Sequence, residues 1–177
     1  MLKWFYPKLY ISSYQLLNPD YLKQHHIKLL VCDIDNTLVP HDVADPDEAV
    51  FAFVEKMKEH GILMALVSNN VEERVKVFAK PLGIPYYPFA KKPFQKQYHQ
   101  ILKDFKLSRD EVAVLGDQLL TDMLGGNLAH FYTILSKPVV TRDLKWTKIN
   151  RLFENLIYRL LEHKELLIRG EFDDETL

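Results

Sequence analysis

The sequence predicts an α/β fold, a three-layer Rossmann-like arrangement in which a mostly parallel sheet carries helices on both faces. Short apolar runs, typical of strands that are covered on both faces, alternate with segments whose apolar residues recur at helical spacing. This alternation is typical of βαβ units. The clearest runs end in small polar or acidic residues, at 33–37, 68–70 and 116–122. The carboxyl ends of parallel strands meet at one edge of a sheet, where such folds bind ligands.

We expect a single domain over residues 1–177. A chain of this length buries roughly two thirds of its unfolded surface in one hydrophobic core and is too short to form two stable cores. The core is expected at about 28–136. An aromatic-rich arm at 1–18 precedes it, and a helix at about 147–168 follows it. The sequence contains no internal repeats and no low-complexity segment.

Composition and charge exclude several classes of protein. With 23 basic and 24 acidic residues, the chain carries no global field that would attract nucleic acid. Its one cysteine, Cys32, excludes an internal disulfide framework, and no Cys and His cluster suggests zinc. No signal peptide and no apolar stretch of about 18 residues is present. We expect a cytoplasmic protein and leave peripheral membrane contact open.

The apolar residues of the amino-terminal arm recur at no regular spacing, so no helix or strand is predicted from periodicity there. We interpret it as a segment that packs across the fold and ends where Asn18 caps a short helix through Leu22. The alternative is an interfacial anchor, because Trp and Tyr flanked by lysines favour the headgroup level of a bilayer. The aromatic residues concerned are Trp4, Phe5, Tyr6, Tyr10 and Tyr14.

Strands and helices then alternate along the core. Helices are expected from Pro46 through His60, from Val71 until Pro81 and Gly83 close it, and from Pro93 to Lys106. Strands are expected at 28–32, 62–67, 84–89, 112–115 and 131–135.

The carboxyl-terminal third adds three expectations. Gly125-Gly126 is interpreted as a helix end. A helical stripe of apolar residues either closes the core or makes a homo-oligomer, and the sequence does not decide between these; it comprises positions 149, 152, 153, 156, 157, 160 and 161. The acidic tail at 171–175 is expected to be mobile.

The polar residues at the strand ends suit a phosphate site. If Asp33 and Asp117 lie about 5 Å apart, their repulsion is about 3 kcal/mol at an effective dielectric constant near 20. A cation is therefore needed, and oxygen ligands without His or Cys favour Mg²⁺. Lys92 supplies a second positive charge. The candidate residues are Asp33, Asp35, Ser68, Asn69, Lys92, Asp117 and Asp122.

The spacing of Asp33 and Asp35 suits nucleophilic and acid–base catalysis. Two residues apart in an extended segment, both side chains point to one side, where one carboxylate attacks phosphorus and the other moves protons. The competing interpretation is a solvated turn, because Asp, Asn and Thr favour loops. Ser68 has a competing role as a helix cap, which is compatible with phosphate binding. Cys32 is expected to pack in the core.

Four motifs in order resemble those of the haloacid dehalogenase (HAD) superfamily of phosphatases, over about residues 28–136. They are Asp33-x-Asp35-x-Thr37, Ser68, Lys92 before Pro93, and Gly116-Asp117-x4-Asp122. The resemblance implies a Rossmann-like fold, an aspartyl-phosphate intermediate and dependence on Mg²⁺.

The resemblance also implies a role for each matched residue. Asp33 matches the nucleophile, and Asp35 matches the acid and base that lends its backbone carbonyl to the metal. Asp117 matches the metal carboxylate. The remaining positions are the phosphate binders Ser68, Asn69 and Lys92 and the supporting residues Thr37 and Asp122.

The intervals between motifs indicate a capless member. Only 30 residues separate Thr37 from Ser68 and 23 separate Ser68 from Lys92, which leaves no room for a cap domain. In lacking a cap, the chain resembles members of subfamily IIIA. The residues that make up its motifs look most like those of the YqeG family, and that family is similar to phosphatidylglycerophosphate phosphatases. A phosphorylated lipid headgroup is then the implied substrate. A soluble nucleotide or sugar phosphatase and a binding or scaffold protein with little turnover stay open.

Overall fold

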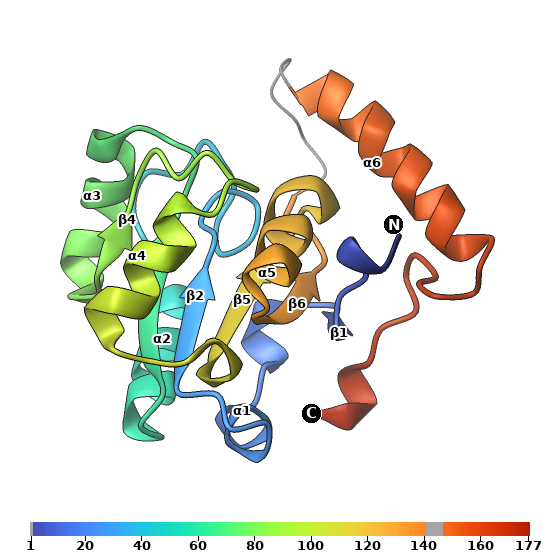
Figure 1. Ribbon diagram of the computed structural model, residues 1–177. Coiled ribbons are helices and arrows are strands. Elements are labelled where there is room, and N and C mark those ends of the chain that lie inside the picture. The colour runs from blue at the N-terminus through green and yellow to red at the C-terminus, as the bar shows by residue number, and fades with distance from the viewer. Residues whose placement is uncertain (1, 141–146) are drawn as a thin grey trace.

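The computed structural model describes the backbone of residues 2–140 and 147–177, and the side chains of 2–140 and 152–177. A six-stranded sheet in the order β1-β6-β5-β2-β3-β4 forms its centre, and every neighbouring pair is parallel (Figure 1). This confirms the predicted fold class. The strands are β1 (Leu9–Ile11), β2 (Leu29–Cys32), β3 (Leu63–Val67), β4 (Tyr86–Tyr87), β5 (Val112–Gly116) and β6 (Tyr132–Ser136).

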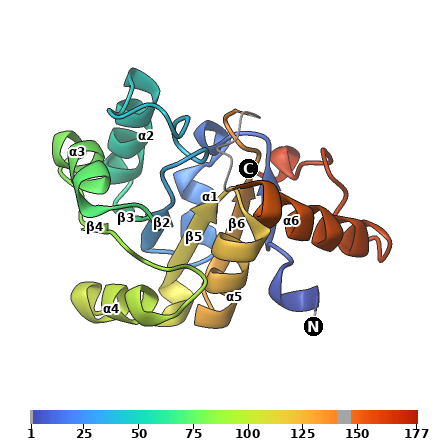
Figure 2. The same cartoon turned by 90° about the horizontal axis from the view of Figure 1, so that it is seen from above.

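Helices cover both faces of the sheet (Figure 2). On one face lie α1 (Pro19–Gln24), α2 (Glu48–Glu59) and α3 (Glu72–Leu82), and on the other lie α4 (Lys96–Phe105) and α5 (Leu124–Ala129). Alternate residues of β2 point to opposite faces, so that Cys32 packs against the first layer and Val31 against the second. Cys32 is fully buried, as expected.

Several helix boundaries differ from the prediction, and the last helix, expected to about 168, ends at Glu162. Asp47 is the N-cap of α2 and accepts a hydrogen bond from the Val50 amide at 2.9 Å, so Pro46 precedes the helix. Pro81 lies inside α3 and does not close it, and Gly83 ends the helix at φ 65°. The helix α4 begins at Lys96 rather than at Pro93.

Gly125 and Gly126 lie inside α5, so their interpretation as a helix end is wrong. A Cβ at Gly126 would lie 2.3 Å from Cγ1 of Val114, and one at Gly125 would lie 3.2 Å from Cα of Pro93. The two glycines therefore let α5 approach β5 and the loop before α4 closely. A short helical segment, Leu119–Met123, leads into α5.

The amino-terminal arm packs on the fold and supplies a strand that periodicity did not reveal. β1 pairs with β6, with Leu9 opposite Ile134. All three residues of β1 are buried, so they show no alternation of polar and apolar residues. Asn18 caps α1 as predicted, because its side chain accepts a hydrogen bond from the amide of Asp20.

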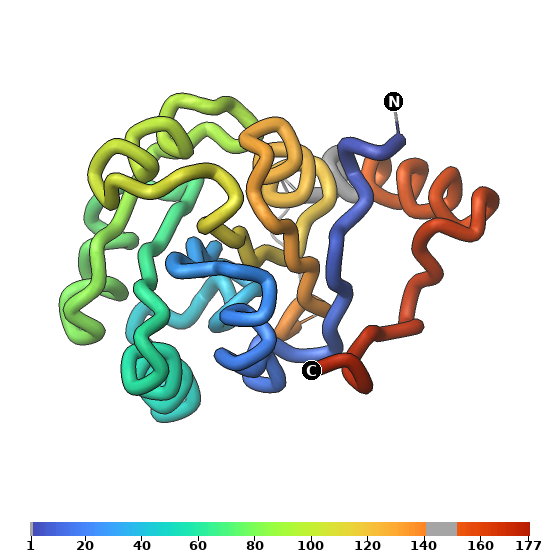
Figure 3. Tube along the Cα trace, turned by 60° about the horizontal axis from the view of Figure 1, so that its bottom comes forward, coloured from blue at the N-terminus to red at the C-terminus, as the bar shows by residue number. Residues whose placement is uncertain are grey.

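The acidic tail is held against β1, which corrects the expectation that it is mobile. The carboxylates of Asp173 and Asp174 accept hydrogen bonds from the amides of Tyr10 and Ser12 at 2.8 and 2.9 Å. The amide of Asp173 donates to the carbonyl of Tyr10 at 2.7 Å. The tail therefore occupies the free edge of the sheet, alongside the amino-terminal arm (Figure 3).

The last helix, α6 (Thr147–Glu162), lies beyond β6 and the amino-terminal arm (Figure 2). Tyr158 and Leu161 are buried with residues of β1, β6 and Leu119–Met123. Of the predicted stripe, Leu161 is thus buried, whereas Leu152, Phe153, Leu156 and Leu160 are exposed; Tyr158 does not belong to that stripe. Within the described parts of the chain, no helix has the length and apolar character needed to span a membrane.

Candidate active site

Three adjacent strands bring the site residues to one edge of the sheet. Asp33 follows β2, Ser68 follows β3 and Asp117 follows β5, and these strands are neighbours in the order β5-β2-β3. The amide of Asp33 donates to the carbonyl of Leu115, which continues the pairing of β2 with β5. All three side chains are buried, although the site lies at the rim of the sheet.

Lys92 joins the carboxylates from the loop after β4. Its Nζ lies 2.5 Å from Oδ1 of Asp33 and 2.6 Å from Oδ1 of Asp122, and it donates to the carbonyl of Val67 at 3.3 Å. Lys92 and Asp122 are 7% and 1% exposed. The structure therefore brings the predicted lysine and the second acid of the fourth motif into contact.

Asn69 holds Lys92 in place. Its Oδ1 accepts from the Lys92 amide at 2.6 Å, and its Nδ2 donates to the Lys92 carbonyl at 3.3 Å. Both ends of the Asn69 amide are thus engaged by the backbone of Lys92, although the sequence suggested that Asn69 binds phosphate. Ser68 is 1% exposed, and its Oγ accepts from the amide of Asn70 at 3.1 Å, so it also orders this turn.

Thr37 lies between two carboxylates. Its hydroxyl is 3.4 Å from Oδ2 of Asp33 and 3.3 Å from Oδ1 of Asp117. A hydroxyl has a single proton, so it donates to one carboxylate at a time. The tight loop that holds it has Asn36 at φ 64°, and the amides of Leu38 and Val39 both donate to the carbonyl of Ile34.

The carboxylates form a compact acidic cluster. Oxygens of Asp33, Asp117 and Asp122 all lie within 4.8 Å of one another. Burial raises the pKa of Asp33 to about 7, with Lys92 opposing the increase and Asp122 adding to it. Burial, together with Asp122 and Asp33, also raises the pKa of Asp117 well above its usual value. Burial disfavours the charged form of Lys92, but Asp122 and Asp33 raise its pKa overall, so it stays charged.

This charge distribution fits a hard divalent cation. One lysine faces three carboxylates, which leaves an excess of negative charge in a buried site. Asp122 is the carboxylate with most donors, because its Oδ2 accepts from the amide of Gln118 and the hydroxyl of Thr121. Among the described residues, Oδ2 of Asp117 has no donor. Asp33 and Asp117 therefore have the greater capacity to bind a cation that prefers oxygen ligands.

Asp35 lies apart from this cluster and is held by α3. Nη2 of Arg74 lies 3.0 Å from Oδ1 of Asp35, and the Asn70 side chain donates to Oδ2 at 3.3 Å. Arg74 also donates to the carbonyl of Ala44 at 2.7 Å, which fixes its guanidinium. Arg74 is not among the predicted site residues, because nothing in its sequence spacing from Asp35 indicates that the two side chains meet.

Comparisons with known proteins agree with this geometry. A family model described as haloacid dehalogenase-like hydrolase matches residues 42–130, which include Ser68, Lys92 and Asp117 but begin after Asp33. The probable phosphatase YqeG of Bacillus subtilis (strain 168) is 40% identical over 162 residues, which cover 92% of this chain and 94% of that protein.

Two solved structures share the fold. The cobalt-bound deoxy-D-mannose-octulosonate 8-phosphate phosphatase of Haemophilus influenzae has a TM-score of 0.54 at 14% identity, over 64% of this chain and 70% of that one. The 3-deoxy-D-manno-octulosonate 8-phosphate phosphatase of Yersinia pestis has a TM-score of 0.51 at 19% identity, over 66% of this chain and 67% of that one. At these identities the likeness concerns the fold alone.

Proposed function

This chain belongs to the haloacid dehalogenase-like hydrolase family and is a phosphatase, and from that premise we propose that it hydrolyses phosphomonoesters with Mg²⁺ through an aspartyl-phosphate intermediate. The observation that carries this proposal is the environment of Asp33. It is a buried carboxylate at a strand end, paired with Lys92 and next to Asp117. Such a group is a competent nucleophile for phosphorus when positive charge neutralises the phosphoryl oxygens.

In the first step, an oxygen of Asp33 forms a bond to phosphorus while the bond from phosphorus to the leaving oxygen breaks. Asp35 donates a proton to that oxygen, so an alcohol leaves. Lys92 and Ser68 hold the transferring phosphoryl group. Lys92 lies 2.5 Å from Oδ1 of Asp33, and the hydroxyl of Thr37 lies 3.4 Å from Oδ2.

In the second step, Asp35 removes a proton from a water molecule, whose oxygen attacks phosphorus and releases Asp33. Arg74 and Asn70 orient the Asp35 carboxylate for both proton transfers. The carboxylates of Asp33 and Asp117 and the backbone carbonyl of Asp35 would hold Mg²⁺. When bound, the cation supplies charge stabilisation to the transferring group and keeps Asp33 ionised.

The proposed substrate is a phosphomonoester on a large or membrane-bound molecule, with phosphatidylglycerophosphate as the leading candidate. The short intervals between the motifs support it, because they leave the site without a cap domain. Phosphate release from phosphatidylglycerophosphate vesicles should then exceed release from a panel of nucleotide and sugar phosphates. Equal rates on both would favour a soluble phosphatase of broad range.

The decisive experiment is Asp33→Asn, assayed with para-nitrophenyl phosphate and Mg²⁺. Because an amide is a poor nucleophile and lacks the charge that Lys92 pairs with, kcat should fall more than about a thousandfold. Circular dichroism should show an unchanged fold. The matched control is Asp110→Asn, an exposed carboxylate at the opposite end of β5, which should retain activity. Turnover by Asp33→Asn near the wild-type rate would exclude the aspartyl-phosphate mechanism.

A further inference from the structure

The segment that carries Lys92 and the segment that carries Asp122 are joined by a second contact, which comes from Gln95. The side-chain amide of Gln95 donates to the carbonyl of Pro93 at 2.9 Å and to the carbonyl of Gly125 at 3.1 Å. We propose that Gln95 is a positioning residue for phosphate binding, which holds the backbone beside Lys92 while the Lys92 ammonium exchanges a protein acceptor for a phosphoryl oxygen. The proposal rests on the phosphatase function above and adds a residue to it.

Gln95 stands at the start of α4 but does not cap this helix. It occupies the N-cap position, where Ser, Thr, Asp and Asn are preferred because their side chains accept a hydrogen bond from an amide of the first turn. The Gln95 side chain makes no such bond. Its two amide protons go instead to Pro93, the neighbour of Lys92 in the sequence, and to Gly125 in α5. The side chain therefore links the loop of Lys92 to α5.

The two contacts between these segments differ in character. Nζ of Lys92 pairs with Oδ1 of Asp122 at 2.6 Å, and Gln95 bonds Gly125 three residues further along each segment. The two backbones approach closely there, because a Cβ on Gly125 would lie 3.2 Å from Cα of Pro93. The first contact is an ion pair inside the acidic cluster, whereas the second contact involves no charged group. The ion pair can therefore change its partners while the second contact stays in place.

The Lys92 ammonium has to exchange a partner in order to bind phosphate. An ammonium has three protons, and Nζ already donates to Asp33, to Asp122 and to the carbonyl of Val67. Holding a phosphoryl oxygen therefore requires that at least one of these three hydrogen bonds is given up. Because a lysine side chain is a flexible stem of four carbons, the place of its ammonium after the exchange depends on the place of its backbone.

Among the described residues, two side chains form hydrogen bonds with the backbone of Lys92 and Pro93. Asn69 engages the amide and the carbonyl of Lys92, and Gln95 engages the next carbonyl, that of Pro93. Asn69 lies in the loop after β3, so it ties Lys92 to the sheet. Gln95 ties the same loop to α5, the helix that directly follows the segment of Asp122. Without Gln95, the loop would keep its tie to the sheet and lose its hydrogen bond to α5.

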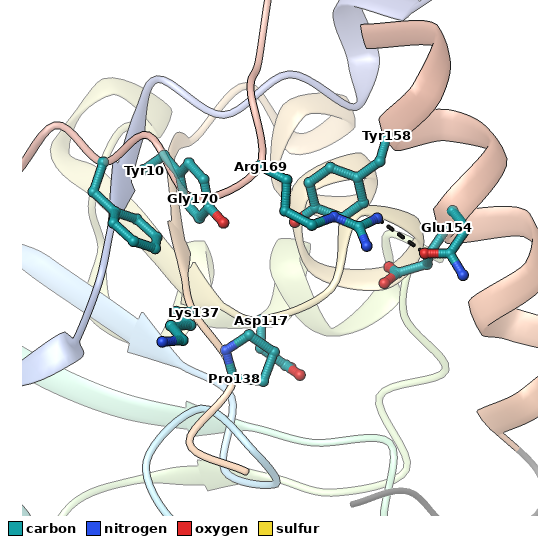
Figure 4. Close-up of a pocket in the computed structure, with 10 residues that line it drawn as sticks. Tyr10, Asp117, Lys137, Pro138, Glu154, Tyr158, Arg169 and Gly170 are labelled. Carbon is teal, nitrogen blue, oxygen red and sulfur yellow. Dashed lines mark hydrogen bonds between the residues drawn. The ribbon is translucent and has the colours of Figure 1, made fainter. Parts of the chain in front are cut away.

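Gln95 acts on the side of the acidic cluster that lies away from its open cavity. A cavity of about 460 Å³ beside β6 is lined by Asp117, Tyr10 and Tyr158, among other residues (Figure 4). Lys92 follows β4, at the other end of the strand order, and is buried. A substitution of Gln95 therefore leaves the residues of the cavity unaltered. A change in phosphate affinity then reports on the side of the site that holds Lys92.

The test compares Gln95→Met with the matched control Gln97→Met. Methionine has a side chain of similar length but no hydrogen-bond donor. Gln97 lies in the same helix, and its amide also donates to a loop carbonyl, that of Pro88 at 3.1 Å. The measured quantity is the inhibition constant of inorganic phosphate against para-nitrophenyl phosphate with Mg²⁺. It should rise about fivefold in Gln95→Met, because two hydrogen bonds that fix the loop of Lys92 are lost, and stay at the wild-type value in Gln97→Met.

An inhibition constant does not depend on how much of the enzyme is folded, so it separates positioning from stability. A merely structural role for Gln95 predicts a lower melting temperature and an unchanged inhibition constant, and that result would overturn the proposal. An equal rise in Gln95→Met and Gln97→Met would overturn it as well. Thermal unfolding is recorded for each variant. If Gln95→Met is unfolded at the assay temperature, Gln95→Glu takes its place with the same expected rise, because its carboxylate cannot donate to the two carbonyls.

Failure of the proposed phosphatase mechanism is distinguishable from failure of this inference. If Asp33→Asn retains turnover, the aspartyl-phosphate mechanism falls, while the inhibition constants still test Gln95. If the wild type does not hydrolyse para-nitrophenyl phosphate, calorimetric titration with inorganic phosphate and Mg²⁺ decides. A dissociation constant that rises about fivefold in Gln95→Met and not in Gln97→Met supports the proposal. Equal constants in the two variants, or absence of phosphate binding by the wild type, would overturn it.

Discussion

At the scale of single residues, the two carboxylates of the first motif have different surroundings. Asp33 lies in the buried cluster with Lys92, whereas the Asp35 side chain is 23% exposed and paired with Arg74. Sequence spacing explains why both lie at the end of β2. It does not reveal Arg74, because the contact between the two residues exists only once α3 has packed beside β2. We assign Arg74 as a positioning residue that acts through Asp35.

The variant Arg74→Gln tests that assignment. Loss of the guanidinium should lower kcat about tenfold for an alkyl phosphate, because an alkoxide needs a proton from Asp35 in order to leave. The loss should be smaller for para-nitrophenyl phosphate, whose leaving group departs without protonation. Steady-state kinetics on both substrates measures the difference, and Arg74→Lys should restore part of the activity.

A purely structural role for Arg74 predicts equal losses on the two substrates, which would refute the assignment. Arg109→Gln provides the matched control, because Arg109 is exposed and lies at the amino end of β5.

At the scale of elements, the strands that position the site could be predicted from the sequence. Contacts that form only when distant elements pack together could not. Buried apolar runs that end in polar residues placed Asp33, Ser68 and Asp117 correctly at neighbouring strand ends. Strand β1 is too short to show a period, and its pairing with the acidic tail links segments about 160 residues apart. Judged from the sequence alone, Gly125-Gly126 is typical of a helix end. In the structure both glycines lie inside α5, and their lack of a side chain lets α5 pack closely on β5.

The contact between α6 and the Leu119–Met123 segment should depend on pH. Burial raises the pKa of Glu154 from 4.5 to about 7, so between these values the folded state binds more protons than the unfolded state. The free energy of unfolding should therefore fall as pH rises through this window, by at most about 3 kcal/mol. Glu154→Gln cannot titrate, and its amide oxygen can still accept from Leu120. It should be more stable than the wild type at pH 8 and similar to it below pH 4.5.

Urea unfolding of both proteins across this pH range measures the effect, because the other titrating groups are common to both and cancel in the difference. The matched control is Glu59→Gln, which removes an exposed carboxylate at the end of α2, away from the contact between α6 and the Leu119–Met123 segment. A constant difference for Glu154→Gln would contradict the proposed burial of this carboxylate.

At the scale of the whole molecule, a near-neutral chain concentrates negative charge at one edge of its sheet. The formal net charge is −1, yet three carboxylates share one lysine in a buried cluster. Unpaired buried charge destabilises a fold, so the acidic cluster should lower the free energy of unfolding when no cation is bound. We therefore expect the proposed binding of Mg²⁺ to stabilise the entire chain, because a ligand that binds only the folded state stabilises it.

Asp117→Asn tests this linkage. Without metal, the variant should melt several degrees above the wild type, because it removes a charge repelled by Asp122 and Asp33, and about 1 kcal/mol corresponds to roughly 2–4 °C for a chain of this size. With Mg²⁺ at about one hundred times its dissociation constant, the wild type should gain about 2.7 kcal/mol and the variant much less. Thermal unfolding in EDTA and in MgCl₂ measures both effects, with Asp110→Asn as the control. If Asp117→Asn melted below the wild type in EDTA, repulsion within the cluster would not be what the cation relieves.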